Sequence, residues 1–310
     1  MIKQMKSCVS VLLLLVSTLL PANCLAQVPN PPGVKVERDL VFASVGGKNL
    51  RLDLYRPDNS SGNVPVVVLI YGGAWMMRNQ WMETPKAMWL ATHGYAAAVI
   101  DYRLSSEALF PAQIHDCKAA VRWLRANAAK YGLDAAHIGA WGESSGGHLA
   151  SLLGVAGNVA ALEGDLGNTN ESSQVQAVVD FFGPTDFLQA QAHALPSSWL
   201  NHDSPTSPES RLIGGPVQEN PEKAEQANPI KYVTHDVPPF LIVHGEQDPL
   251  VPCNQSELLF DALKKVHANV TFYKIAGAGH DGPVFDSDMM RAAVLAFLDK
   301  YLKPHSNTKP

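Results

Sequence analysis

Short runs of apolar residues alternate along the chain with longer stretches in which apolar residues recur every three or four positions. Residues 64–71 (VPVVVLIY) are apolar throughout, which is typical of a strand buried on both faces. Residues 50–55 alternate and predict an early antiparallel strand; further apolar runs predict strands at 96–100, 137–141, 175–182, 240–244 and 270–275. Helical spacing predicts helices at 111–131, 147–153, 256–266 and 287–302. This order favours a mostly parallel sheet with helices on both faces.

Residues 183–235 interrupt this alternation. The segment is rich in proline and polar residues, for example ALPSSWLNHDSPTSPES, and shows no strand period. A long irregular insertion in a compact domain is commonly a lid or a binding loop. Because it follows the predicted strand at 175–182, we expect a lid-like insertion near the strand ends, within a single domain over residues 27–310.

The first 26 residues have the pattern of a signal peptide. Lys3 and Lys6 precede an apolar stretch at 9–20, and Cys24-Leu25-Ala26 offers small residues at the positions that a signal peptidase reads. We therefore expect residues 1–26 to be removed and the protein to be secreted or periplasmic. The apolar stretch is short for a membrane span, so no stable membrane insertion is expected after cleavage. An uncleaved anchor and a lipoprotein processed at Cys24 are the alternatives.

The charge balance argues against one class of partner. The chain carries 24 Lys and Arg against 29 Asp and Glu, a formal net charge of −5, and contains no long basic run. Binding to nucleic acid is therefore not expected. Cys117 and Cys253 would remain after cleavage. Export permits a disulfide between them, but two free thiols are the favoured interpretation.

The most specific motif is Gly-Glu-Ser-Ser-Gly at residues 142–146, which fits G-x-S-x-G. A buried strand is predicted before it and a helix of small residues after it, which is the context of a nucleophile on a sharp strand-to-helix turn. The glycines leave room for the neighbouring strand and helix. The motif predicts Ser144 as a nucleophile; a structural glycine-serine turn is the alternative.

A serine hydroxyl is scarcely ionised near neutral pH, so it needs a base, and the base needs an orienting acid. His280 lies in a glycine-rich loop (GAGHDG, 277–282) between the last predicted strand and the last helix. Asp248 follows the predicted strand at 240–244. The chain order Ser144, Asp248, His280 is the order expected in α/β-hydrolases.

Other residues compete for these roles. Asp186 and Glu246 are rival acids, and Asp186 is interpreted as a cap of the insertion. His148 and His244 are interpreted as structural histidines, the first within its helix and the second at the end of a buried strand. Asp101 and Arg103 are expected to pair and brace loops. No metal site is expected.

An oxyanion hole requires backbone N–H groups beside the nucleophile. The amide of Ser145 is one candidate donor, and the loop after the strand at 64–71 supplies Gly73 and Ala74. A plain turn is the alternative for that loop. Trp75 from the same loop and Trp199 from the insertion are the predicted substrate-binding side chains. With Phe187 they would form an aromatic acyl pocket, unless the insertion residues only pin the insertion to the domain.

Together these motifs resemble bacterial α/β-hydrolases grouped with bifunctional feruloyl and acetyl xylan esterases, which are close to hormone-sensitive-lipase-like esterases. The resemblance covers residues 35–303 and rests on YGGAW (71–75), DYR (101–103), DCKAAVRWL (116–124), GESSGG (142–147) and HGEQDPLVP (244–252). It implies an α/β-hydrolase fold with an eight-stranded sheet and no cofactor. Such relatives hydrolyse acetyl or hydroxycinnamoyl esters, often on plant cell-wall polysaccharide. They usually carry histidine where this chain has Tyr71, which puts the support of the oxyanion loop in question.

Three other readings remain open. A general carboxylesterase or lipase-like enzyme would share the same residues. Serine exopeptidases of the prolyl-oligopeptidase kind share the elbow and the residue order but usually carry a large propeller ahead of the hydrolase domain. A non-catalytic hydrolase-like binding protein typically lacks the nucleophile or the base, whereas Ser144 and His280 are both present here.

Overall fold

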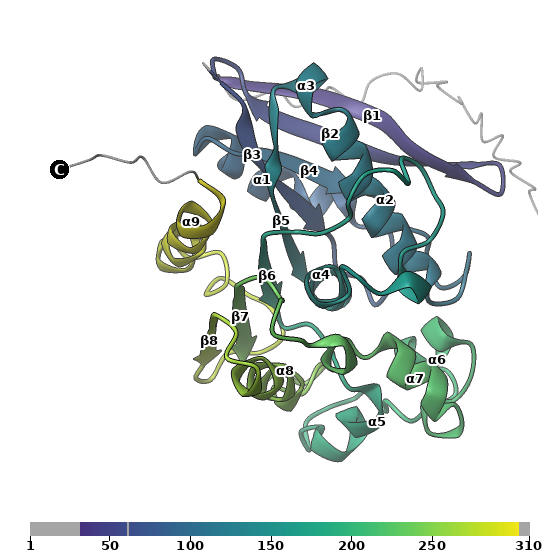
Figure 1. The fold of residues 1–310 in the computed structure, drawn as a ribbon. Coiled ribbons are helices and arrows are strands. Elements are labelled where there is room, and N and C mark those ends of the chain that lie inside the picture. The colour runs from purple at the N-terminus through teal and green to yellow at the C-terminus, as the bar shows by residue number, and fades with distance from the viewer. Residues whose placement is uncertain (1–31, 61, 304–310) are drawn as a thin grey trace, which may run out of the picture. The chain divides into compact units, whose positions relative to one another are not determined.

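The computed structural model describes residues 32–60 and 62–303, so the predicted signal peptide, residues 1–26, lies outside the described residues. Eight strands form one sheet in the order β1-β2-β4-β3-β5-β6-β7-β8 (Figure 1). β1 and β2 pair antiparallel, β2 pairs antiparallel with β4, and every other neighbouring pair is parallel. The predicted mostly parallel α/β-hydrolase sheet is confirmed. The strands are β1 Val34–Val45, β2 Lys48–Pro57, β3 Val64–Ile70, β4 Ala96–Ile100, β5 Leu133–Glu143, β6 Ala177–Phe181, β7 Phe240–Gly245 and β8 Val270–Ile275.

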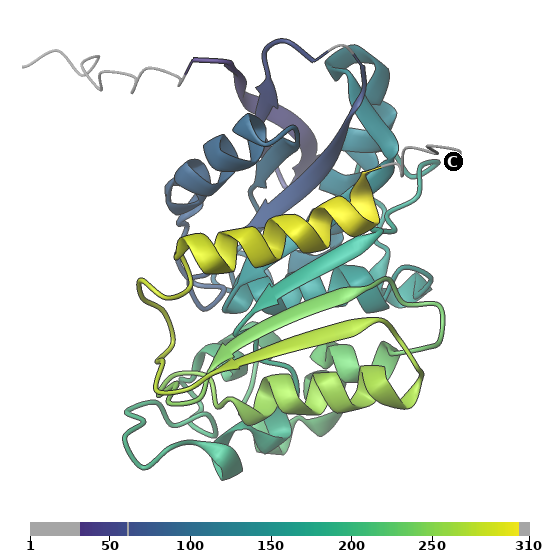
Figure 2. The ribbon, with the colours of Figure 1, turned by 90° about the vertical axis from the view of Figure 1, so that its left-hand side faces the viewer.

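Helices cover both faces of the sheet. Alternate side chains of the fully buried strand β3 enter two separate cores: Val66 and Val68 join the core with α2, α4 and α8, whereas Val67 joins the core with α1 and α9. Figure 2 shows α9 lying across the strands on its face of the sheet. The helices are α1 Thr84–Thr92, α2 Ala112–Ala126, α3 Ala128–Tyr131, α4 Ser145–Val155, α5 Phe187–Ala190, α6 Pro208–Ile213, α7 Pro221–Ala227, α8 Asn254–Lys265 and α9 Asp288–Leu302.

Three elements differ from the prediction. β1 and α1 were not expected. The apolar residues of β1 do not alternate regularly, because two register shifts interrupt the strand, and the nine-residue α1 buries only Ala87, Leu90 and Ala91. The helix expected at 111–131 ends at Ala126, and the short α3 follows Asn127. Weak local patterns of this kind are decided by tertiary packing.

The insertion between β6 and β7 contains no strand, as expected, but it is not irregular throughout. It contains the short helices α5, α6 and α7 and the 3₁₀-helices η3 Gln191–His193, η4 Val217–Glu219 and η5 Pro229–Tyr232. Phe187, Leu212 and Val217 are buried in the same core as α2 and α4. This part of the chain is therefore packed on the domain through apolar contacts. Within residues 32–60 and 62–303, no helix combines the length and apolarity that crossing a membrane requires.

Candidate active site

Ser144 occupies a sharp turn between β5 and α4. Its backbone has φ 53° and ψ −122°, a conformation that a non-glycine residue adopts only when the surroundings enforce it. A Cβ on Gly142 would overlap the carbonyl of Gly146, and a Cβ on Gly146 would overlap the carbonyl oxygen of Ile70 in β3. Both glycines are thus required by close backbone approach. The turn raises the Ser144 hydroxyl above the sheet at the N-terminus of α4.

The predicted nucleophile, base and acid come together at this turn. His280 Nε2 lies 2.9 Å from Ser144 Oγ, and His280 Nδ1 lies 2.7 Å from Asp248 Oδ2. Asp248 is in the loop after β7, and His280 is in the loop after β8. Because parallel strands present their carboxyl ends at one edge of the sheet, residues 136 positions apart can share one hydrogen-bonded chain. The distances are those of a serine that can pass a proton to an imidazole.

Asp248 is held by four hydrogen bonds. Its Oδ1 accepts from the amides of Leu250 and Val251 at 2.8 and 2.9 Å, and its Oδ2 contacts His280 and, at 3.1 Å, His244 Nε2. Burial by itself raises the pKa of the Asp248 carboxyl, but the hydrogen bonds from the two histidines outweigh burial and hold this pKa well below its ordinary range. Asp248 is therefore a fixed, buried carboxylate.

The sequence did not reveal the role of His244. This fully buried side chain contacts two acceptors through Nε2, Asp248 Oδ2 and, at 2.9 Å, the carbonyl of Val251. Its Nδ1 lies 2.7 Å from Ser256 Oγ. Two acceptors on one nitrogen place the proton on Nε2 and leave Nδ1 to accept from the Ser256 hydroxyl. His244 is thus a positioning residue for Asp248, and its spacing of four residues from Asp248 was the only signal for this role in the sequence.

The rival residues occupy other environments. Asp186 caps α5, where it accepts from the amide of Leu188 at 3.1 Å and from Gln189 Nε2 at 2.6 Å. Glu246 lies at the surface, 3.7 Å from Lys274. His148 is fully buried, and its Nε2 lies 2.7 Å from the carbonyl of Ala227, which ties α4 to the insertion. Burial lowers the pKa of His148 to about 4, so this imidazole is neutral.

The loop that carries Gly73 and Ala74 lies directly beside Ser144. A Cβ on Gly72 would come within 3.3 Å of the Ser144 Cβ. Gly73 and Ala74 have positive φ values of 132° and 55°, and the carbonyl of Gly73 accepts from Met76 and Met77. Among the residues that the structure describes, the amides of Gly73 and Ala74 have no acceptor. The Ser145 amide, at the first residue of α4, has no partner in the preceding turn, as at every helix start.

Tyr71 supports this loop from below. Its hydroxyl donates to Asp101 Oδ1 at 3.2 Å, its ring stacks on Tyr102 with centroids 4.5 Å apart, and its carbonyl accepts from the Tyr102 hydroxyl at 3.0 Å. Burial raises the pKa of Tyr71, which keeps the hydroxyl protonated as a donor. The buried tyrosine pair therefore braces the loop at the position where relatives are expected to carry histidine.

The predicted pairing of Asp101 with Arg103 is wrong. Asp101 Oδ1 accepts from Arg78 Nε at 3.1 Å, whereas Arg103 binds Asp116 through both carboxylate oxygens, at 2.7 Å for the shortest contact. The partners come from the loop after β3 and from α2, so the pairing depends on tertiary packing. The bracing role of both residues is retained.

The predicted aromatic acyl pocket is not assembled as expected. Trp75 is only 2% exposed and packs against Phe187 and His148, with ring centroids 5.6 and 5.2 Å away. It joins the core and offers almost no surface to a substrate. Trp199, in contrast, is 77% exposed on the insertion.

Cys117 and Cys253 are both free thiols. Within the described ranges, no group of three or more His, Cys, Asp or Glu side chains could hold a metal ion.

The fold and the Ser144–His280–Asp248 chain at the strand ends define an α/β-hydrolase. The chain belongs to the BD-FAE family, whose model matches residues 52–263. It is 33% identical to esterase LipQ of Mycobacterium tuberculosis over 271 residues, which are 84% of this chain and 61% of LipQ. With esterase LipC of the same organism it shares 30% identity, over 76% of this chain and 57% of LipC. The chain thus spans about 60% of the length of these curated relatives.

Two solved structures are also similar to this chain in fold and sequence. A truncated carbohydrate esterase from gut microbiota superposes with a TM-score of 0.78 at 34% identity, covering 86% of this chain and 95% of that chain. A bifunctional GH43-CE protein of Bacteroides eggerthii gives a TM-score of 0.76 at 37% identity, with 86% of this chain and 38% of that chain covered.

Proposed function

We propose that this protein hydrolyses carboxylic esters through an acyl-enzyme formed on Ser144. The observation that carries the proposal is the continuous chain of contacts from Ser144 Oγ through the His280 ring to Asp248, at 2.9 and 2.7 Å. Relatives named esterases at 30–33% identity support the reaction class. A non-catalytic binding protein would not need the strained turn at Ser144 and would be free to lose the contacts of His280.

The reaction follows from the geometry. Ser144 Oγ attacks the ester carbonyl carbon while His280 Nε2 takes the hydroxyl proton, and Asp248 stabilises the resulting imidazolium. The oxyanion accepts hydrogen bonds from the amides of Ser145, Ala74 and Gly73. His280 then gives its proton to the departing alkoxide, which leaves as the alcohol. Water attacks the acyl-enzyme with His280 again as base, which releases the carboxylic acid and restores Ser144.

The proposed substrates are short-chain acyl or hydroxycinnamoyl esters, most of all those on plant cell-wall polysaccharide. Support comes from the two structural relatives described as a carbohydrate esterase and a GH43-CE protein. A general carboxylesterase is the second candidate, favoured by the likeness to LipQ and LipC. Trp199 is the remaining candidate for contact with the acyl group, because Trp75 is buried.

Export to the periplasm or medium, inferred from residues 1–26, is part of the proposal and predicts a mature N-terminus at Gln27.

Two measurements test this function. Ser144→Ala is expected to lower kcat for p-nitrophenyl acetate by about 10⁴- to 10⁶-fold with the thermal unfolding transition retained. Ser145→Ala is the matched control, since only its backbone amide is used, and a wild-type rate in purified Ser144→Ala would overturn the mechanism.

A panel of acetylated xylan, methyl ferulate and p-nitrophenyl esters of rising chain length decides the substrate class. Preference for decanoyl over acetyl and feruloyl esters would point to a lipase-like enzyme.

A further inference from the structure

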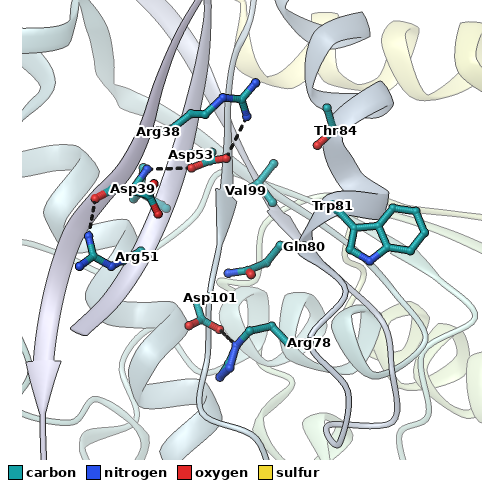
Figure 3. Close-up of a pocket in the computed structure, with 11 residues that line it drawn as sticks. Arg38, Asp39, Arg51, Asp53, Arg78, Gln80, Trp81, Thr84, Val99 and Asp101 are labelled. Atoms are coloured by element: carbon teal, nitrogen blue, oxygen red, sulfur yellow. Dashed lines mark hydrogen bonds and ion pairs between the residues drawn. The ribbon is translucent and has the colours of Figure 1, made fainter. Parts of the chain in front are cut away.

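A cavity of 420 Å³ lies between β1, β2 and β4 on one side and η1, Gln80–Glu83, on the other (Figure 3). Its volume is within the range of about 300–1,000 Å³ that is typical of ligand pockets. Ser144, Asp248 and His280 do not line it. One wall is Asp101, which accepts the hydroxyl of Tyr71, and Tyr71 directly precedes the loop beside Ser144. The cavity is therefore linked to the loop beside Ser144 through the hydrogen bond between Asp101 and Tyr71, and it is separate from the candidate catalytic residues.

A β-bulge builds one wall of this cavity. The register of β1 against β2 shifts between Glu37 and Leu40, and Asp39 has φ 56°, a left-handed conformation for a non-glycine residue. Successive residues of a regular strand point to opposite faces, but here Arg38 and Asp39 both line the cavity. Both also bind Asp53: Arg38 Nη1 donates to Oδ2 at 3.2 Å, and the Asp39 amide donates to Oδ1 at 2.9 Å. The bulge thus holds a fixed set of polar groups toward the cavity.

The charges that line the cavity balance. Three guanidinium groups, Arg38, Arg51 and Arg78, face three carboxylates, Asp39, Asp53 and Asp101. Figure 3 shows the pairs Arg38–Asp53 and Arg78–Asp101, at 3.2 and 3.1 Å, on different sides of the space. An anion would meet the carboxylates and a cation the guanidinium groups, at a cost in either case. A neutral ligand with many hydrogen-bonding groups is the class that suits this lining.

Two side chains of η1 complete the cavity. Figure 3 shows the Gln80 side-chain amide projecting between the strands and η1, without a hydrogen bond to the other residues drawn. Trp81 stands at the edge of the cavity and is 73% exposed. Sugar hydroxyls both donate and accept hydrogen bonds, as an amide does, while the C–H face of a sugar ring can lie on an exposed indole.

We propose that this cavity is a carbohydrate subsite that holds one sugar unit of the polysaccharide chain carrying the ester. Gln80, Arg38 and Asp53 bind its hydroxyl groups, and Trp81 covers the neighbouring sugar unit at the edge. This inference rests on the proposed function and names where the polymer is recognised. Since the sugar unit in the subsite and the sugar unit that carries the ester belong to one chain, binding in the subsite raises the local concentration of the ester at Ser144. The subsite therefore favours polymeric over small esters.

The first test measures binding without turnover. Full-length Ser144→Ala protein is titrated calorimetrically with unesterified xylohexaose, cellohexaose and mannohexaose. Binding of at least one hexasaccharide is expected, with Kd raised about tenfold when Gln80→Ala or Trp81→Ala is added, as for the loss of one good contact. Met82→Ala is the matched control, because Met82 is also exposed on η1 but does not line the cavity. Absence of binding for all three sugars, or equal Kd values in every variant, would overturn the subsite.

The second test separates the subsite from the proposed function. For Gln80→Ala, the ratio of kcat/KM for acetylated xylohexaose to that for p-nitrophenyl acetate is expected to fall about tenfold through KM, and the fall is expected to shrink with acetylated xylobiose. If wild-type protein cleaves only p-nitrophenyl acetate, the proposed polysaccharide substrate is wrong. If it cleaves acetylated xylohexaose and the ratio does not change in Gln80→Ala, the subsite alone is wrong.

Discussion

Replacement of Asp248 by Asn isolates the part of the site that orients the base. Four donors surround the carboxylate: the amides of Leu250 and Val251 on Oδ1, and His244 and His280 on Oδ2. An asparagine oxygen can keep the two backbone donors, but its NH₂ group then faces the imidazoles. His280 must in turn accept at Nδ1 and carry its proton on Nε2. The lone pair that would receive the Ser144 proton is lost.

The expected loss follows from this change of tautomer. A serine hydrolase with the wrong tautomer loses on the order of 10⁴ in kcat, which corresponds to about 5.4 kcal/mol of transition-state stabilisation. The substitution keeps the shape of Asp248, so its effect on catalysis is larger than its effect on packing. His244 faces the same NH₂ group, and the loss of its charge-assisted hydrogen bond is expected to lower the free energy of unfolding by about 1.5–3 kcal/mol.

The assay is kcat for p-nitrophenyl acetate between pH 6 and 9, with urea unfolding measured on the same samples. Asp186→Asn is the matched control, because Asp186 only caps α5 and asparagine caps helices about as well. Its kcat is expected to stay within about twofold of wild type, with a stability change below about 0.5 kcal/mol. Asp248→Asn with more than a tenth of the wild-type kcat, or a larger loss in Asp186→Asn, would refute the assignment of the acid.

Three further predictions concern His148, His244 and Trp199. The pKa of His148 is depressed in the folded protein to about 4, so its contribution to stability is present above pH 6.5 and is lost as the pH falls toward 4, up to about 3 kcal/mol. In urea unfolding, the free energy of unfolding of His148→Gln should depend less on pH in this window than that of wild type, and an unchanged pH dependence would contradict the prediction. His244→Phe should lower the free energy of unfolding by about 2–4 kcal/mol and also lower kcat, because Asp248 and Ser256 lose their hydrogen-bond partner. A loss of stability with unchanged kcat would show that His244 does not position Asp248 for catalysis. Trp199→Ala should change the free energy of unfolding by less than about 0.5 kcal/mol, since the ring is exposed, while kcat/KM for methyl ferulate falls about tenfold relative to kcat/KM for p-nitrophenyl acetate. An equal change for both substrates would show that the indole does not contact the acyl group.

The strongest features of the fold could be predicted because their signals are local. β3 reads as a buried strand from its own residues, since a strand covered on both faces is apolar at every position. The turn at Ser144 could likewise be predicted from consecutive residues, because Gly142 and Gly146 leave room for backbone atoms that approach to contact distance. Asp248 and His280 were predicted from their places after strands, and the common edge of the parallel sheet explains why residues so far apart meet.

Other features depend on which surfaces meet, and the sequence contains no local sign of that. Trp75 follows a loop that touches the nucleophile, yet its ring turns into the core against Phe187 from the insertion. Arg103 lies two residues after Asp101 but binds Asp116 in α2, where a bidentate geometry is available. In each case a long-range partner outweighed a neighbour in sequence.

The sequence alone was enough to predict a nucleophile at Ser144, because nucleophilic serine chemistry requires particular residue types on particular turns. Only the tertiary structure decided how the site is supported and what surrounds it. The second histidine on Asp248 depends on the loop after β7 folding back over the strand end. The cavity beside Asp101 depends on a bulge in the edge strand β1, whose register against β2 is set by the pairing of the two strands. Packing between distant segments fixes both, since the free energy of such contacts depends on how the surfaces fit and not on the order of residues within either segment.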